Sequence, residues 1–132
     1  MILVDSSVVL DLVLNDPHWA EWSQSKLEAV GDDERFAIND IVYAEVSIGY
    51  KNIADLEAMM AAWRLEFAPT PRQALFRAGK AYRQYKSRGG ARTGVLPDFF
   101  VGAHASVEKW PLLTRDPARI RTYFPTVTLI AP

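Results

Sequence analysis

The chain has 132 residues, of which 49% are hydrophobic, and a formal net charge of -1. A chain of this size and composition can bury a core without covalent staples, so we expect one domain spanning residues 1–132. It has no cysteine, which excludes disulfides, thiolate metal sites and a cysteine nucleophile. Since no apolar run approaches the roughly 20 residues of a membrane span, we expect a cytoplasmic protein that does not enter the membrane.

The spacing of apolar residues predicts strands that alternate with helices along the chain. Strands are expected at residues 2–4, 36–38, 65–68, 111–114 and 127–130. Helices are expected over 8–13 after a cap at Ser6 or Ser7, and over 18–30, 41–51, 53–63, 71–87, 98–109 and 117–123. This alternation predicts an α/β protein, a three-layer sandwich with a central, mainly parallel sheet flanked by helices.

The small net charge conceals an uneven distribution. Most acidic residues precede residue 67, and residues 67–97 contain none. The same segment holds seven basic residues: Arg72, Arg77, Lys80, Arg83, Lys86, Arg88 and Arg92. A basic segment of this kind attracts a polyanion such as RNA, although a solvated helix face gives the same pattern.

Two acidic residues stand directly after predicted strands. The stretch MILVD ends on Asp5, although aspartate is depleted from strands, and the stretch LLTRD ends on Asp116. In open parallel sheets, binding and catalytic groups gather outside the carboxyl ends of the strands. Both residues also fit the simpler role of a helix cap. Asp11, on the polar stripe of the first helix, is expected to be solvated.

Two further acidic residues fall on apolar helix faces. Glu45 shares a stripe with Ile41 and Ile48, which predicts that it turns toward the apolar side. Asp98 shares a stripe with Val101 and Ala105, although its place after a proline also fits a helix cap. An error in helix phase would place Glu45 on the surface instead.

Four carboxylates at one site would repel one another, and a hard divalent cation relieves that repulsion. Carboxylate oxygens are the ligands that Mg²⁺ and Mn²⁺ prefer, and such a cation activates water and orients a phosphodiester. The basic segment would attract the polyanionic backbone that an acidic site alone repels. The residues therefore predict a metal-dependent nuclease.

The order of LVDSS, an inward Glu45, PDFFVGAHA and LLTRD resembles the PIN-domain family. It is most similar to the VapC-type ribonuclease toxins of toxin–antitoxin pairs. The resemblance implies an acidic quartet of Asp5, Glu45, Asp98 and Asp116. Asp5 and Asp98 would be the main ligands of Mg²⁺ or Mn²⁺, and Glu45 and Asp116 would act directly or through water.

The resemblance also implies supporting roles and partners. Ser6 and Thr114 match hydroxyl residues of the family, whereas Ser7 stands where the family often has asparagine. The expected activity is endoribonuclease cleavage of cellular RNA, which arrests growth and leaves a 5′-phosphate and a 3′-hydroxyl. The expected partners are RNA, a second copy of the chain in a homodimer, and a cognate antitoxin that covers the site.

Two alternatives stay open: a PIN-domain nuclease of RNA processing, and a non-catalytic interaction module, which leaves an inward Glu45 unexplained. Other readings are disfavoured. An aspartate-nucleophile phosphatase would require a second acid at Ser7, and a receiver domain would require a late lysine at a strand end, whereas Lys109 precedes its strand. His18 and His104 lack the spacing of metal ligands and are expected to be structural.

Overall fold

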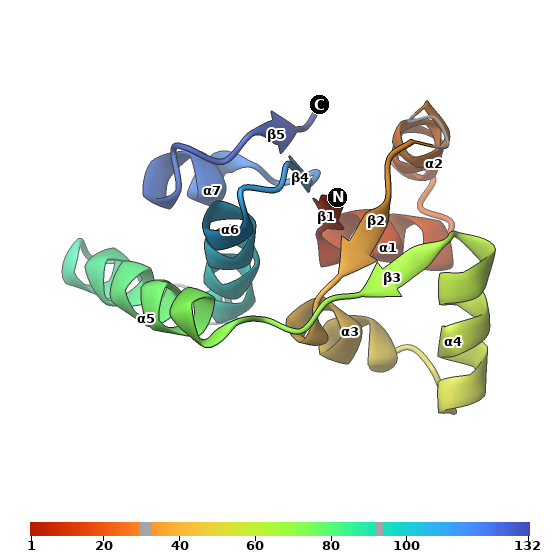
Figure 1. Cartoon of the computed structure of the whole chain (residues 1–132), viewed down its shortest axis with the longest axis horizontal. Coiled ribbons are helices and arrows are strands. Elements are labelled where there is room, and N and C mark those ends of the chain that lie inside the picture. Colours follow the sequence, from red (N-terminus) through yellow and green to blue (C-terminus); the bar gives the residue numbers. More distant parts are fainter. Residues whose placement is uncertain (30–32, 92–93) are drawn as a thin grey trace.

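The computed structural model describes residues 1–29, 33–91 and 94–132 (Figure 1). Arg92, one of the predicted RNA-binding residues, lies outside these ranges. Within the described ranges, five strands form a single sheet in the order β3-β2-β1-β4-β5, and every neighbouring pair is parallel. The strands are β1 (Ile2–Val4), β2 (Phe36–Ile38), β3 (Leu65–Phe67), β4 (Leu112–Leu113) and β5 (Leu129–Ile130).

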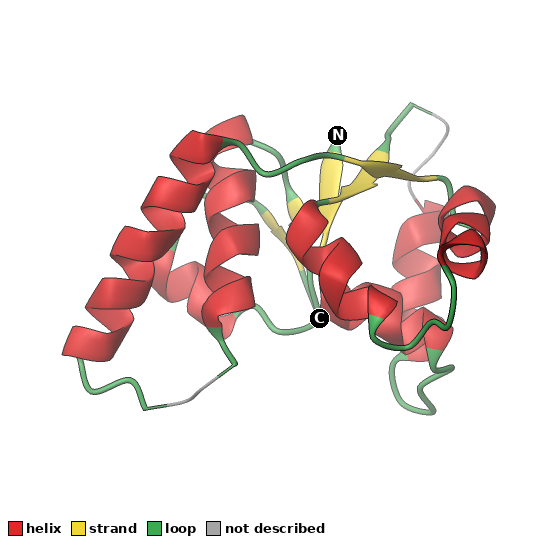
Figure 2. Cartoon of the chain, turned by 90° about the horizontal axis from the view of Figure 1, so that it is seen from below, coloured by secondary structure: helices red, strands yellow, loops and turns green. Residues whose placement is uncertain are grey.

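Seven helices within the described ranges flank the sheet. They are α1 (Ser6–Val13), α2 (Ala20–Ala29), α3 (Asp40–Ser47), α4 (Ile53–Ala62), α5 (Arg72–Ser87), α6 (Leu96–Glu108) and α7 (Ala118–Tyr123). Figure 1 shows α5, α6 and α7 gathered on one side and α1, α2 and α4 on the other, with the strands between them. Figure 2 shows α5 and α6 running side by side. The predicted three-layer α/β sandwich is thus confirmed.

The hydrophobic core lies along the central strands. Leu3, Val4 and Leu112 are fully buried, as expected for parallel strands that are covered on both faces. Helix α2 begins at Ala20 rather than at the predicted residue 18, because the Asp16 carboxylate accepts hydrogen bonds from the backbone N–H groups of His18 and Trp19. These bonds hold a turn in place of the first helical residues.

The strand order determines where a site can form. From β1 the chain proceeds through β2 to β3 on one side of the sheet, and then crosses to β4 and β5 on the other side. The direction therefore reverses between β1 and β4, and a crevice opens at the carboxyl ends of such strands. Asp5 follows β1, and the segment 114–116 follows β4. The fold brings both to the same edge of the sheet.

Gly102 allows α7 to pack closely on α6. A Cβ atom at this position would lie 2.5 Å from Cδ2 of Phe124 and 2.9 Å from Cδ1 of Ile120. Since atoms in packed interiors do not approach so closely, a larger side chain would force the two helices apart. This packing positions the first turn of α7 beside the first turn of α6.

Among the described residues, no helix is both long and apolar enough to cross a bilayer.

Candidate active site

Asp5 is held at the end of β1 by three hydrogen bonds. Its Oδ1 accepts from the Ser6 backbone N–H at 2.9 Å, and its Oδ2 accepts from the hydroxyls of Ser7 at 2.9 Å and Thr114 at 2.8 Å. Asp5 itself is the N-cap of α1, so the prediction of a cap at Ser6 or Ser7 was wrong. Ser7 instead joins two segments, because it also accepts the backbone N–H of Arg115 at 3.2 Å.

Burial dominates the charge state of Asp5, which is only 8% exposed. Burial raises the pKa of the Asp5 carboxyl and the charge of Asp98 raises it further, while the hydrogen bonds from Thr114, Ser7 and Ser6 oppose this rise. The net direction is upward. Asp98 therefore lies within electrostatic range of Asp5, although the two residues come from distant parts of the sequence.

Glu45 is half-buried on α3 and belongs to the same group of charges. Burial raises its pKa, the charges of Asp5 and Asp98 add to the rise, and a hydrogen bond from the Ser6 side chain opposes it. The predicted stripe was nevertheless wrong. Val42 and Val46 face the core, whereas Ile48 is 88% exposed. Glu45 borders the core face and reaches toward Asp5 instead of sharing a buried stripe with Ile48.

Asp98 lies within the first turn of α6 and is not its cap, since Val95 occupies the cap position. The residues predicted to share its stripe, Val101 and Ala105, are both buried. The Asp98 carboxylate bears an ion pair in which Nη1 of Arg119 donates to Oδ2 at 2.6 Å. A residue from α7 thus contacts one of the predicted metal ligands.

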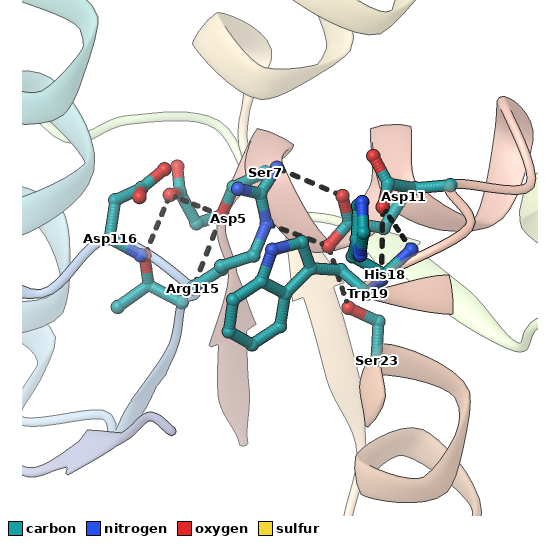
Figure 3. A network of polar contacts seen from close by, with 10 residues as sticks. Asp5, Ser7, Asp11, His18, Trp19, Ser23, Arg115 and Asp116 are labelled. Atoms are coloured by element: carbon teal, nitrogen blue, oxygen red, sulfur yellow. Dashed lines mark hydrogen bonds and ion pairs between the residues drawn. The ribbon is translucent and has the colours of Figure 1, made fainter. Parts of the chain in front are cut away.

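Asp116 is more exposed than the other three acids. Its backbone N–H donates to the Thr114 hydroxyl at 3.1 Å, and the same hydroxyl donates to Asp5. Figure 3 shows Asp116 beside Asp5 at this edge of the sheet. Pro117, not Asp116, takes the cap position of α7, and no side chain of the described structure caps that helix. The simple capping explanation for Asp116 therefore fails.

A polar cavity of about 590 Å³ lies beside two of the four acids, Asp98 and Asp116. Its lining includes Asp98, Asp116, Arg115, Arg119 and Thr122. Two carboxylates and two guanidinium groups thus border one open space. A cavity of this composition can accept both a cation and the phosphate groups of a substrate.

An unpredicted ion pair holds Arg115, which lines the cavity (Figure 3). Nε and Nη2 of Arg115 each donate to the Asp11 carboxylate at 2.9 Å, and the Ser23 hydroxyl adds a third bond of 2.9 Å. Asp11 is 2% exposed, so the prediction that it is solvated was wrong. The Arg115 guanidinium also lies 5.4 Å from the centre of the Trp19 ring. Sequence periodicity carried no signal for this pair.

The four acids supply suitable donors for a hard divalent cation. The three that influence one another electrostatically, Asp5, Glu45 and Asp98, offer the carboxylate oxygens that Mg²⁺ and Mn²⁺ prefer. In the described ranges, however, no three acidic, histidine or cysteine side chains are gathered closely enough to form a ligand set. The donor chemistry therefore fits, while Arg119 holds one of the donors.

Five of the predicted RNA-binding residues lie on α5, and Arg88 follows its last residue. Arg72, Arg77, Lys80, Arg83, Lys86 and Arg88 are all exposed. Arg88 is linked to the site through aromatic rings, because its guanidinium lies 5.7 Å from the centre of Tyr123 and Tyr123 packs against Tyr85. Arg119 lies 5.9 Å from the centre of the Tyr85 ring. The last turn of α5 is thereby tied to the residues around Asp98.

His104 has a structural position. It is buried, its Nδ1 lies 3.2 Å from Nδ2 of Asn39, and its ring packs against Trp110. Burial lowers its pKa, so the ring is neutral near pH 7.

A parallel sheet with acidic side chains at its switch point is typical of α/β domains that bind a ligand outside the carboxyl ends of their strands. The PIN domain family model matches residues 2–125, and the chain belongs to this family. PIN domains are generally nucleases and typically use divalent metals. The predicted resemblance to the PIN-domain family is thus confirmed. None of the curated proteins matches the sequence.

Solved structures of toxin–antitoxin complexes share the fold. VapBC2 from Rickettsia felis, bound to a promoter DNA fragment, has 20% identity and a TM-score of 0.73, over 99% of this chain and 98% of that chain. VapBC-1 from nontypeable Haemophilus influenzae has 18% identity and a TM-score of 0.71, over 99% and 98%. A toxin–antitoxin complex from Klebsiella pneumoniae has 22% identity and a TM-score of 0.69, over 97% and 96%.

Proposed function

We propose that this chain is a Mg²⁺- or Mn²⁺-dependent endoribonuclease in which residues 1–132 act as a single PIN domain. One observation carries the proposal. Burial raises the pKa of both Asp5 and Glu45 and the Asp98 charge adds to each rise, so three acids from α6, the end of β1 and α3 share one electrostatic environment. Mutual repulsion of this kind destabilises the metal-free protein and is relieved by a cation.

The residues of the site would have different roles. Asp5 and Asp98 would be the main ligands, and Glu45 and Asp116 would complete the site directly or through water. Thr114 fixes the orientation of Asp5, and Ser6 bonds Glu45. A bound Mg²⁺ or Mn²⁺ would supply Lewis acidity toward the scissile phosphate and lower the pKa of an attacking water.

We further propose that the protein acts in the cytoplasm as the toxin of a toxin–antitoxin pair. Support comes from the VapBC structures, which match nearly the full length of both chains. The expected partners are cellular RNA, a second copy of the chain and a small antitoxin that covers the acidic site. A PIN nuclease of RNA processing would have the same acids, and the presence or absence of a neighbouring antitoxin gene separates the two roles.

The direct test of the toxin role is growth arrest on induced expression. The wild type should stop growth, Asp98→Asn should not, and coexpression of the adjacent small reading frame should restore growth. Asp55→Asn provides a control, since Asp55 is an exposed aspartate in the first turn of α4. Equal arrest by Asp98→Asn and the wild type, at equal protein levels, would rule out the carboxylate mechanism.

A further inference from the structure

Asp98 already forms an ion pair with an arginine of its own chain. Nη1 of Arg119 lies 2.6 Å from Oδ2 of Asp98, and the two side chains are 24% and 37% exposed. Such short, charge-assisted bonds are about twice as strong as bonds between neutral groups. A bonded guanidinium is therefore present where the proposed function requires a metal ion.

Packing determines the position of this arginine. Arg119 precedes Ile120, which is buried and contacts α6 at the position where Gly102 leaves room. Its guanidinium lies 5.9 Å from the centre of the Tyr85 ring on α5. An arginine that stacks on an aromatic ring and bonds a carboxylate loses less freedom than a solvated surface side chain. The contact is thus fixed by three helices.

The charges around Asp98 explain why a counter-ion is favourable there. Asp5 and Glu45 both respond electrostatically to Asp98. A cation at Asp98 therefore reduces the repulsion among all three acids. A guanidinium and a divalent ion are alternative means to the same end, and each weakens the binding of the other at this carboxylate because like charges repel.

We propose that Arg119 is an exchangeable counter-ion, which neutralises Asp98 in the metal-free protein and leaves it when a divalent cation binds. This inference rests on the proposed function. Once released, Arg119 remains on the wall of the cavity that it shares with Arg115 and Asp116. A guanidinium in that place is suited to bind a phosphate of the RNA with two parallel hydrogen bonds. Arg119 thus serves the metal-free and the substrate-bound states in turn.

The first test is the affinity for Mn²⁺, measured by calorimetry. Arg119→Met keeps an apolar stem against Tyr85 and removes the competing charge, so it should bind Mn²⁺ about threefold to tenfold more tightly than the wild type. Arg121→Met is the matched control, because Arg121 is an exposed arginine on the same helix. Its Mn²⁺ affinity should stay near that of the wild type. Unchanged or weaker binding by Arg119→Met alone would overturn the exchange.

A second readout separates exchange from a structural role. With the RNA that the wild type cleaves, Arg119→Met should need less Mn²⁺ for half-maximal cleavage, yet cleave more slowly at saturating Mn²⁺. A misfolded site would bind metal and RNA less well together, so a parallel loss of both would also overturn the exchange.

Asp98→Asn distinguishes failure of this inference from failure of the proposed function. Mn²⁺ binding that depends on Asp98 but is identical in Arg119→Met and the wild type would refute only the exchange. If neither the wild type nor any variant binds Mn²⁺, the metal-dependent function fails and the exchange fails with it.

Discussion

Arg115 and Asp11 lie 104 positions apart in the sequence and form a two-point ion pair, with both N–O distances at 2.9 Å. The pair fastens the loop after β4 to the buried side of α1. The same loop is also fastened through the Arg115 backbone N–H, which donates to Ser7, a partner of Asp5 on the same helix. The segment that carries Thr114 and Asp116 is therefore held at two points of α1.

Asp11→Asn should destabilise the protein markedly. The substitution keeps the shape of the side chain but leaves the Arg115 guanidinium, which is partly buried, without its counter-charge. Breaking a buried ion pair on one side costs several kcal/mol, and we expect a loss of about 2–4 kcal/mol in the free energy of unfolding, measured with urea. Glu21→Gln, an exposed position on α2, should change stability by less than about 0.5 kcal/mol. Similar effects of the two substitutions would contradict the role assigned to the pair.

The ion pair of Asp11 with Arg115 could not be predicted from the sequence. Local patterns predicted β1 and β2 at their observed bounds, because continuous apolar runs are characteristic of buried parallel strands. Helical periodicity placed Asp11 on a polar stripe and could not show that this stripe is covered by Arg115. A buried charge depends on a partner that the fold supplies, and nothing local in the sequence identifies that partner.

The acidic site was predictable for a different reason. Asp5 and Asp116 follow strands directly, and the topology of a parallel sheet brings such positions together. Glu45 was placed toward the apolar side through an incorrect helix stripe, since the core-facing residues are Val42 and Val46. The contact of Arg119 with Asp98 was not predictable, because it depends on the close packing of α7 on α6.

Thr114→Val should disturb the site more than its small size implies. The Thr114 hydroxyl is buried, donates to Asp5 and accepts from the Asp116 backbone N–H. Its removal takes one of three hydrogen bonds from Asp5 and the Thr114 bond from the Asp116 N–H, and it should cost about 1–3 kcal/mol of unfolding free energy. Because this bond lowers the pKa of Asp5, the pKa should rise further in the valine variant. Thr114→Ser keeps the hydroxyl and should leave the pKa, measured by carboxyl NMR titration, at the wild-type value. An equal pKa in the valine variant would contradict the assignment.

Asp5→Asn should stabilise the metal-free protein at neutral pH. The folded state raises the pKa of Asp5 above 3.8, so it binds the proton more tightly than the unfolded state does. Stability contributed by the protonated carboxyl is complete below about pH 4 and is lost as the pH rises through the folded-state pKa. Asparagine removes this loss and caps α1 as well as aspartate does.

The measurement is the unfolding free energy of both proteins in EDTA between pH 4 and pH 8. The advantage of Asp5→Asn over the wild type should grow as the pH rises. Saturating Mn²⁺ should reverse the order of the two proteins, because the cation stabilises only a carboxylate that binds it. A difference that shrinks with rising pH would show that the burial of Asp5 does not oppose its ionisation.

The basic surface of α5 should contribute to RNA binding through charge alone. Arg83 and Lys86 are exposed on α5, so Arg83→Glu with Lys86→Glu should weaken RNA binding without altering the melting temperature by more than a few degrees. The slope of log affinity against log salt should become shallower by about 2, one for each lost phosphate contact. Lys51→Glu, an exposed lysine outside α5, should leave the slope unchanged. An unaltered slope in the double variant would mark α5 as solvated surface.

We propose above all that carboxylates at the end of β1, on α3 and on α6 bind a divalent cation, and that the protein uses this cation to hydrolyse RNA. The most direct measurement maps the RNA ends that the purified protein leaves with Mg²⁺ or Mn²⁺, with EDTA, and in Asp98→Asn. We predict 5′-phosphate and 3′-hydroxyl ends that form only with the cation and only in the protein that retains Asp98. Cyclic phosphate ends, or undiminished cleavage in EDTA, would contradict the account.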